Sequence, residues 1–197
     1  MAGETPVPGD GVMAALDGFE PRSDVEAKDV ARIRSLVRGG DPWSRSSPVH
    51  VTGSAIVVHP ASGRVLLRWH ERMRGWFQLG GHGDPGESDP FAIALRESRE
   101  ETGLGDLAAW PDRARPALVH VVVVPVPAGR GEPEHEHADM RYVLATAIPE
   151  EATPESPSAA LRWLSVDDAT ALVGQDNLRT SLTRVAELLP GRLRFVR

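Results

Sequence analysis

The feature that most constrains this chain is a cluster of glutamates on one face of a short predicted helix. Glu97, Glu100 and Glu101 are spaced i, i+3 and i+4, which places their carboxylates side by side on a helix. Like charges at this spacing repel each other, and their place near the C-terminal end opposes the helix dipole. Local stability therefore does not explain the cluster. A hard divalent cation such as Mg²⁺ or Mn²⁺ does, because it binds several oxygen ligands at once.

The residues before and after the glutamates predict a glycine-rich loop followed by one well-delimited helix. The loop at 80–86 contains four glycines, which permit tight turns and a close approach of the backbone to a ligand. Asp89 is a predicted N-cap, Pro90 suits the first helical position, and Gly103 is typical of a helix end. The helix is therefore expected over residues 90–102. Without the loop, the glutamates are also compatible with an ordinary solvated acidic face with arginine partners.

This stretch closely resembles the Nudix box, Gly-x5-Glu-x7-Arg-Glu-U-x-Glu-Glu-x-Gly-U, where U is usually bulky and aliphatic. The positions that match the motif in identity and order are Gly81, Glu87, Arg96, Glu97, Glu100, Glu101, Gly103 and Leu104. There are two departures from the motif. Eight residues rather than seven separate Glu87 from Arg96, and Ser98 occupies the first U position.

The extra residue matters because an insertion within a helix rotates everything before it by about 100°. The turn at 88–90 lies upstream of the predicted helix and is able to absorb it. In that case the carboxylate face is retained, whereas the insertion argues against the usual contact between Glu87 and Arg96. Ser98 lies off the carboxylate stripe and is expected to loosen packing rather than to change the chemistry.

The resemblance, rather than the residues alone, implies a fold and an activity. The implied fold is α/β, a Nudix-like α/β/α sandwich with a mixed β-sheet. The implied activity is hydrolysis, dependent on Mg²⁺ or Mn²⁺, of a phosphoanhydride bond in a nucleoside diphosphate joined to another group. Carried over position by position, the metal ligands are Glu97, Glu100, Glu101 and the carbonyl of Gly80. Glu97, Glu100 and Arg96 are the expected catalytic residues, with Glu97 as a candidate to take a proton from water and Arg96 to orient it.

Hydrophobic periodicity in the rest of the chain agrees with a layered α/β fold. Strands are expected at 51–59, 64–69, 76–79, 117–126, 140–147 and 161–165, and further helices at 24–38, 167–172 and 177–189. The valine-rich run in 117–126 is typical of a strand covered on both faces.

The chain divides into three expected parts. Residues 1–23 are rich in glycine, proline and acidic side chains and are expected to form a flexible tail. Residues 24–50 hold an amphipathic helix and a linker, and residues 51–197 form the Nudix hydrolase domain. The helix is expected to dock on the main domain or on a second subunit, and a homodimer through its apolar stripe is the corresponding hypothesis.

A second group of candidate ligands lies in the acidic and histidine-rich stretch after the valine-rich run. Many Nudix proteins supply a further carboxylate from outside the box, as a metal ligand or as the base. Glu136 and Glu134 are the first candidates here and Asp139 the next, and a solvated polar loop is the alternative. His135 and His137 share one side of an extended chain and are compatible with a transition-metal site, but no third ligand stands at a diagnostic spacing.

Four residues near the glycine loop are candidate substrate contacts. Arg68 and His70 belong to a cationic stretch before the loop, and Gly81 and His82 lie within it, all suited to a polyphosphate chain. Ordinary hairpin surface and a loop-bracing role for His82 are equally compatible with these positions. His120, inside the valine-rich run, is interpreted as a hydrogen-bonded core histidine.

Composition restricts partners and location. The net charge of −6 gives no support to a nucleic-acid or anionic-membrane surface, and the absence of cysteine excludes thiolate metal sites. No apolar run approaches the roughly 20 residues of a spanning helix, and the first residues lack a signal-peptide pattern. A cytoplasmic protein with a small nucleotide-type substrate is therefore expected.

Proteins with two other functions also contain this sequence motif. Isomerases of isoprenyl diphosphates typically rely on a catalytic cysteine, which this chain lacks. Non-catalytic proteins that bind a nucleotide or sugar nucleotide usually lose box carboxylates or carry a DNA-binding domain. Because all three box glutamates are present, hydrolysis is the preferred interpretation.

Overall fold

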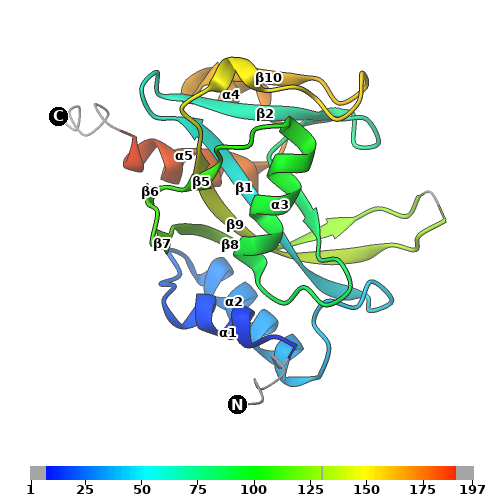
Figure 1. The fold of residues 1–197 in the computed structure, drawn as a ribbon. Coiled ribbons are helices and arrows are strands. Elements are labelled where there is room, and N and C mark those ends of the chain that lie inside the picture. The colour runs from blue at the N-terminus through cyan, green and yellow to red at the C-terminus, as the bar shows by residue number, and fades with distance from the viewer. Residues whose placement is uncertain (1–7, 130, 190–197) are drawn as a thin grey trace, which may run out of the picture.

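A computed structural model describes residues 8–129 and 131–189 of the chain (Figure 1). Its helices are α1 (Asp10–Asp17), α2 (Asp24–Arg38), α3 (Pro90–Thr102), α4 (Val166–Leu172) and α5 (Asp176–Leu188), with a 3₁₀ turn η1 (Pro149–Glu151). Its strands are β1 (Val49–His59), β2 (Arg64–His70), β3 (Gly75–Phe77), β4 (Leu79–His82), β5 (Ala108–Ala109), β6 (Pro111–Asp112), β7 (Arg115–Pro116), β8 (Leu118–Val126), β9 (His135–Ala145) and β10 (Leu161–Ser165). Within the described ranges, no helix is both long enough and apolar enough to cross a membrane.

Strand β1 forms the centre of a mixed sheet (Figure 1). It pairs in parallel with β9, from Val49 opposite Glu136 to Val58 opposite Ala145. On its other side it pairs antiparallel first with β4 and then with β2. Strands β3 and β10 pair with β2, whereas β5 and β8 pair with β9. The expected mixed sheet is therefore confirmed.

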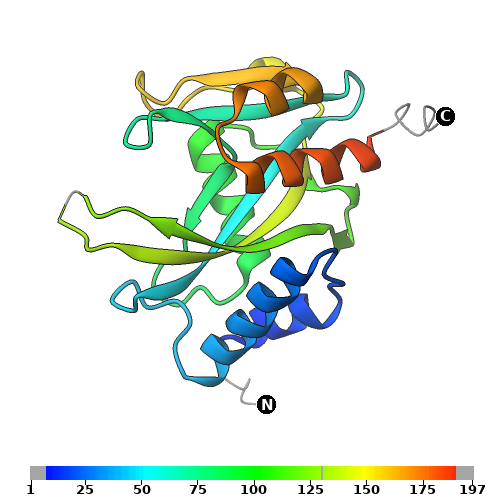
Figure 2. The same cartoon turned by 180° about the vertical axis from the view of Figure 1, so that it is seen from behind.

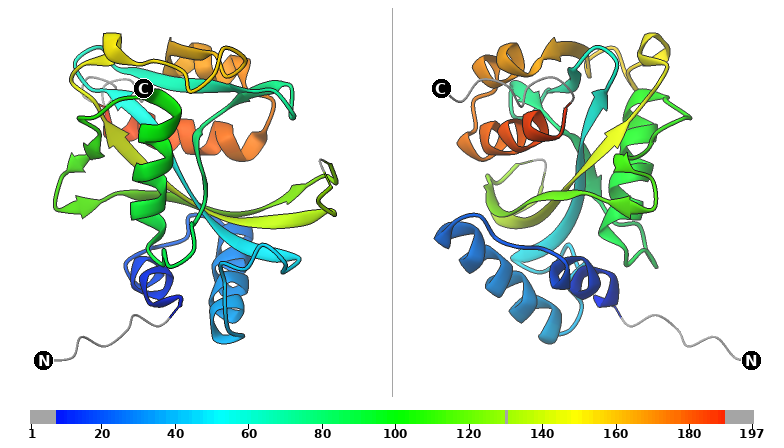
Figure 3. Two further views of the ribbon diagram at one scale, coloured as in Figure 1. Left: turned by 45° about the vertical axis from the view of Figure 1, so that its right-hand side comes forward. Right: turned by 90° about the vertical axis from the view of Figure 1, so that its left-hand side faces the viewer.

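Helices cover both faces of this sheet, which confirms the α/β/α sandwich (Figures 2 and 3). Alternate residues of β1 point to opposite faces. Val51, Ala55 and Val57 contribute to the core shared with α1, α2 and α3. Ile56 and Val58 contribute to the core shared with α4 and α5. Burial on both sides explains why β1 is continuously apolar over residues 55–58.

Helix α3 has the limits that its capping residues predict. The side chain of Asp89 accepts a hydrogen bond of 2.9 Å from an N–H of the first turn, and Gly103 ends the helix with φ of 68°. The inserted residue lies before the helix and leaves the carboxylate face intact. The helix packs closely on β1 at Gly53, where a Cβ atom would collide with the carbonyl oxygen of Pro90.

The N-terminal helices pack onto the rest of the chain. Helix α1 lies inside the segment expected to be a flexible tail, and its Val12 and Leu16 are buried in the core, so that expectation is wrong for the helix. Residues 1–7 of the expected tail lie outside the described residues. Helix α2 has the expected limits, and its Val30 and Ile33 are buried in the same core. The apolar stripe of α2, on which the homodimer hypothesis rests, therefore packs against the core of its own chain.

Helix α2 also covers the edge of β8 that does not pair with β9. The backbone N–H groups of Val121 and Val123 donate to the carboxylates of Glu26 and Asp29, at 3.2 and 3.1 Å. Unpaired N–H groups at a sheet edge are a template for pairing with another chain. The helix therefore protects an edge that the strand order leaves open.

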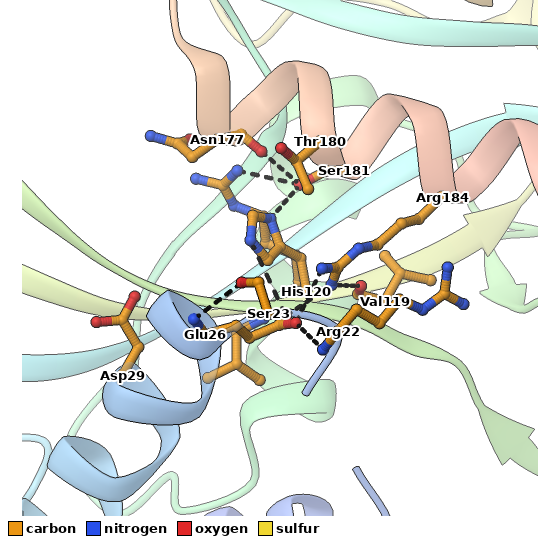
Figure 4. A network of polar contacts seen from close by, with 12 residues as sticks. Arg22, Ser23, Glu26, Asp29, Val119, His120, Asn177, Thr180, Ser181 and Arg184 are labelled. Carbon is orange, nitrogen blue, oxygen red and sulfur yellow. Dashed lines mark hydrogen bonds and ion pairs between the residues drawn. The ribbon is translucent and has the colours of Figure 1, made fainter. Parts of the chain in front are cut away.

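Glu26 is also part of a buried polar network that joins α2 to α5 (Figure 4). The guanidinium of Arg184 donates to both carboxylate oxygens of Glu26, at 2.6 and 2.8 Å, and to the carbonyl of Val119 at 2.7 Å. His120 is buried beside this pair, with Nδ1 2.9 Å from the hydroxyl of Ser181. The interpretation of His120 as a hydrogen-bonded core residue is confirmed.

Three strand predictions need correction. The strand expected at 76–79 is divided at Gln78, because β3 pairs with β2 whereas β4 pairs with β1. Strand β9 begins at His135, earlier than expected, because pairing with β1 and β8 orders the histidine-rich stretch. Strand β8 is buried over 120–122, between α2 and α5, while Pro125 is exposed.

Candidate active site

Arg96 connects the box carboxylates to the glycine loop. Its guanidinium donates to both oxygens of Glu87 (3.0 and 2.8 Å), to Glu97 (3.1 Å), to Glu100 (2.9 Å) and to the carbonyl of His82 (2.9 Å). Arginine is suited to this role because its donors form a rigid planar fork. One side chain thus fixes the relative positions of the carboxylates and the strand.

The loop before α3 restores the contact that the insertion was expected to disfavour. Asp84 and Glu87 close a tight turn in which the N–H of Glu87 donates to the carbonyl of Asp84 at 2.9 Å. In return, the N–H of Asp84 donates to the carboxylate of Glu87 at 2.8 Å. This turn directs Glu87 towards Arg96, so the expectation of a lost contact is wrong.

Strand β4 runs against the carboxylate face of α3. The N–H of Gly80 donates to the carboxylate of Glu101 at 2.9 Å, and Nε of Arg68 lies 3.3 Å from the other oxygen of Glu101. A Cβ atom on Gly81 would lie 2.7 Å from the carboxyl carbon of Glu97, so a larger residue here would displace the end of that side chain. Two glycines and one arginine of the expected site therefore lie directly at the carboxylates.

Burial changes the ionisation of these acids. It raises the pKa of Glu101 to about 7 and also raises the pKa of Glu97, although Arg68 and Arg96 act in the opposite direction. Hydrogen bonds from Arg96 lower the pKa of Glu87 instead. Neighbouring buried acids that resist ionisation are stabilised as carboxylates by a nearby cation. The arrangement therefore favours a divalent ion with oxygen ligands.

A cavity of about 440 Å³ lies beside β4. Three of the expected substrate contacts line it: His70, Gly81 and His82. Arg68 does not line this cavity and lies at Glu101 instead. The four expected contacts are thus divided between the cavity and the carboxylate site, with the glycines of β4 between the two.

Asp139, a candidate base, also lines the cavity but is already fully engaged. Its carboxylate is buried and accepts hydrogen bonds from Thr52, Ser54, Gln78 and Arg141. Four donors occupy the oxygens with which a general base would accept a proton from water. The structure therefore gives Asp139 a positioning role in the cavity wall.

Glu136, the expected extra metal ligand, has a different partner. Its carboxylate accepts two hydrogen bonds from Arg32 of α2. Glu134 is exposed in the loop before β9. The ion pair with Arg32 gives Glu136 another partner in this structure, and its role as a metal ligand stays a prediction.

A cluster of four histidines, two of them not expected as partners, lines or adjoins the cavity. His135 and His137 are the pair identified from sequence, and His50 and His82 complete the group. Burial lowers the pKa of His82 to about 4 and that of His137 to about 3, so both rings are neutral at pH 7. Nothing in the sequence spacing pointed to His50, because it lies far upstream on another strand.

Comparisons with known proteins bear on the family and the fold of this chain. A family model described as NUDIX domain matches residues 49–184. No curated protein matches the sequence significantly.

Three solved structures illustrate the similarity in fold. The E. coli dihydroneopterin triphosphate pyrophosphohydrolase is 18% identical with a TM-score of 0.51, over 70% of this chain and 94% of that chain. A NUDIX-family hydrolase from Clostridium perfringens is 22% identical with a TM-score of 0.51, over 71% and 97%. A C. elegans Ap4A hydrolase in a binary complex is 16% identical with a TM-score of 0.53, over 70% and 95%. At these identities the likeness shows the fold alone.

Proposed function

The chain belongs to the Nudix family, and on that premise we propose that it is a hydrolase that requires Mg²⁺ or Mn²⁺. Its proposed reaction is cleavage of a phosphoanhydride bond in a nucleoside diphosphate joined to another group. The observation that carries the proposal is the convergence of Glu97 and Glu100, both held by Arg96, on the glycine strand β4. The names of two similar structures, a triphosphate pyrophosphohydrolase and an Ap4A hydrolase, support the same class of reaction.

The residues at this place fit a hard divalent cation. Glu97, Glu100 and Glu101 offer carboxylate oxygens and Gly80 offers a carbonyl oxygen, a donor set that Mg²⁺ and Mn²⁺ prefer. Gly81 leaves a space beside Glu97 that any Cβ atom would fill. When bound, the ion supplies Lewis-acid chemistry, which neutralises the diphosphate and makes water a better nucleophile at neutral pH.

We assign proton abstraction from the attacking water to Glu97. Its carboxylate lies against the glycine strand at Gly81, beside the proposed ion, where a water activated by the ion would be within its reach. Arg96 donates to this carboxylate at 3.1 Å and is itself held by two hydrogen bonds to Glu87, so the base has a defined orientation. Glu136 has no part in this assignment, because Arg32 holds its carboxylate.

The cavity beside β4 is the proposed site for the organic part of the substrate. Its volume of about 440 Å³ is in the range of small-ligand pockets. Met73 and Phe77 provide apolar wall, and Arg72 provides a cation for an additional phosphate. Because the cavity and the carboxylate site share Gly80 and Gly81, the anhydride bond lies over the glycine strand in this arrangement.

A panel of nucleotide substrates, assayed for phosphate release with and without Mg²⁺, tests the proposal. We expect the wild type to turn over at least one diphosphate conjugate, and Glu100→Gln to lower kcat by about 10³-fold with little change in thermal unfolding. Glu150→Gln, on the exposed turn η1 outside the site, is the matched control and retains full activity. Binding across the whole panel without turnover would favour a non-catalytic nucleotide sensor, and the hydrolase proposal would then fail.

A further inference from the structure

Four histidine side chains meet where β1, β4 and β9 lie side by side. His137 stands opposite His50 in the parallel pairing of β1 with β9, and His82 stands opposite Thr52 in the antiparallel pairing of β1 with β4. His135 is two residues before His137 and therefore shares its face of β9. One ring nitrogen from each residue lies within 4.8 Å of the others. A hydrogen-bonded sheet thus holds the cluster in place.

The Nε2 atoms of the four rings form a row with hydrogen-bond spacing. His50 and His82 are 3.0 Å apart, His82 and His137 are 3.1 Å apart, and His137 and His135 are 3.1 Å apart. A ring nitrogen carries either a proton or a lone pair. Each of the three contacts is therefore a hydrogen bond only if one nitrogen has a proton and the other has a lone pair.

The backbone sets the tautomer of the two outer rings. Nδ1 of His50 lies 3.3 Å from the carbonyl oxygen of Ser47, and Nδ1 of His135 lies 2.9 Å from that of Pro133. A carbonyl only accepts hydrogen bonds, so both Nδ1 atoms carry the proton. An outer ring with its one proton on Nδ1 consequently presents a lone pair on Nε2 to the cluster.

No placement of protons on the two inner rings satisfies all three contacts. If His82 and His137 both carry a proton on Nε2, the outer contacts are hydrogen bonds but two protons face each other in the middle. If either lacks that proton, one outer contact joins two lone pairs. Protonating the inner rings on Nδ1 does not change this result. A cation removes the conflict, because each Nε2 atom can then offer a lone pair to the positive charge instead of to another lone pair.

We therefore propose that His50, His82, His135 and His137 form a binding site for a transition-metal ion of the Zn²⁺ type. Imidazole nitrogens suit Zn²⁺, Cu²⁺ and Ni²⁺, whereas Mg²⁺ takes oxygen ligands. With Zn–N bonds of about 2.0–2.1 Å, a tetrahedral site has ligand–ligand edges of about 3.4 Å. Three of the six Nε2 pairs, at 3.0 and 3.1 Å, are close to that edge, and one ring nitrogen of each residue lies within 4.8 Å of the others. Hydrogen bonds from Nδ1 to carbonyls are also the usual outer contacts of metal-binding histidines.

This site is separate from the carboxylate site, although both involve β4. Gly81 faces Glu97, and the next residue, His82, points to the other side of the strand because successive side chains alternate. One site offers oxygen ligands and the other nitrogen ligands, so they select different ions. Because His82, His135 and His137 line the cavity, an ion held by them ties β4 to β9 and places positive charge in the cavity wall.

Metal binding to the full chain, without substrate, tests the proposal independently of any hydrolysis. Protein freed of metal with a chelator and kept in excess Mg²⁺ is titrated with Zn²⁺ against a chromophoric chelator, and separately with Co²⁺. We expect one Zn²⁺ per chain and the intense visible absorption of tetrahedral Co²⁺. His82→Ala and His135→Ala are expected to weaken Zn²⁺ binding by more than about 100-fold and to abolish the Co²⁺ absorption.

Two control variants separate this site from others. His59→Ala removes a histidine outside the cluster, and Glu100→Gln alters the carboxylate site, so both are expected to bind Zn²⁺ as the wild type does. Circular dichroism checks folding, and His135→Ala, half-buried at the start of β9, carries the test if His82→Ala does not fold. The proposal is overturned if folded His135→Ala binds Zn²⁺ as tightly as the wild type. It is equally overturned if Glu100→Gln, rather than the histidine variants, loses the ion.

Discussion

The buried ion pair between α2 and α5 allows a quantitative test of how the N-terminal helices are held (Figure 4). Glu26 is 2% exposed and accepts two hydrogen bonds from Arg184 and one each from the backbone N–H groups of Arg22 and Val121. Glu26→Ala removes the carboxylate from all four donors. The guanidinium of Arg184, itself 7% exposed, is left buried without a counter-charge.

The expected loss of stability is large. Removing one partner of a buried ion pair costs about 3–5 kcal/mol, and a stranded backbone donor adds about 1–3 kcal/mol when water does not reach it. We therefore expect Glu26→Ala to lower the free energy of unfolding by about 4–8 kcal/mol. The double variant Glu26→Leu, Arg184→Met is expected to cost much less than the sum of the single changes, because it keeps the volume and removes both charges.

Urea unfolding at pH 7, followed by circular dichroism, measures these differences. Glu187→Ala is the matched control, since Arg22 and Glu187 form another arginine–glutamate pair with side chains 55% and 51% exposed. An exposed pair contributes less than about 1 kcal/mol. The reasoning is refuted if Glu26→Ala costs no more than Glu187→Ala, or if the two single changes add up in the double variant.

The same pair predicts a pH dependence. Burial pushes the pKa of Glu26 up, but Arg184 and the backbone N–H groups together hold it below its ordinary value of 4.5. Because the folded-state pKa is the lower one, the contribution to stability is present above pH 4.5 and is lost as the pH falls through the folded-state pKa. Wild-type stability should therefore fall more steeply in acid than that of Glu26→Gln. Equal slopes in urea unfolding at a series of acid pH values would contradict this.

Three further predictions concern the box and the sheet edge. Ser98→Ala is expected to raise the free energy of unfolding by about 1–2 kcal/mol, because the buried hydroxyl has no hydrogen-bond partner in the described structure; an unchanged urea midpoint would count against this. Gly81→Ala is expected to displace the flexible end of Glu97 and lower kcat by about 10²-fold while the chain stays folded, whereas Gly105→Ala, with open space around it, retains activity. Removing residues 1–40 uncovers the edge of β8, and sedimentation should show self-association; a single unchanged species would argue that α2 does not protect the edge.

Local signals in the sequence determined the box helix and its charged face. An N-cap, a proline at the first position and a glycine at the end define this helix of 13 residues. Helical periodicity alone then places the glutamates on one side. The apolar patterns of the other helices and of most strands are equally local, so the layered fold was predictable. The resemblance of the box to a known motif supplied the reaction class.

Contacts between distant segments were decided only by the tertiary structure. The turn at Asp84 restored the contact between Glu87 and Arg96, which counting residues along the box argued against. Arg32 of α2 is the partner of Glu136, a contact between distant segments that the sequence did not indicate. Such partners depend on which strands pair and in which register. The residues next to a side chain in the sequence do not indicate which residues will lie beside it on a neighbouring strand.

The histidine cluster shows this division most clearly. The sequence contains a His-x-His pair, and no third candidate ligand stands at a diagnostic sequence spacing from it. Parallel pairing of β1 with β9 places His50 beside His137, and antiparallel pairing of β1 with β4 adds His82. A shift of one residue in either register would turn these rings to the opposite face. The sequence supplied the histidines, and the hydrogen-bonded register of three strands brought them together.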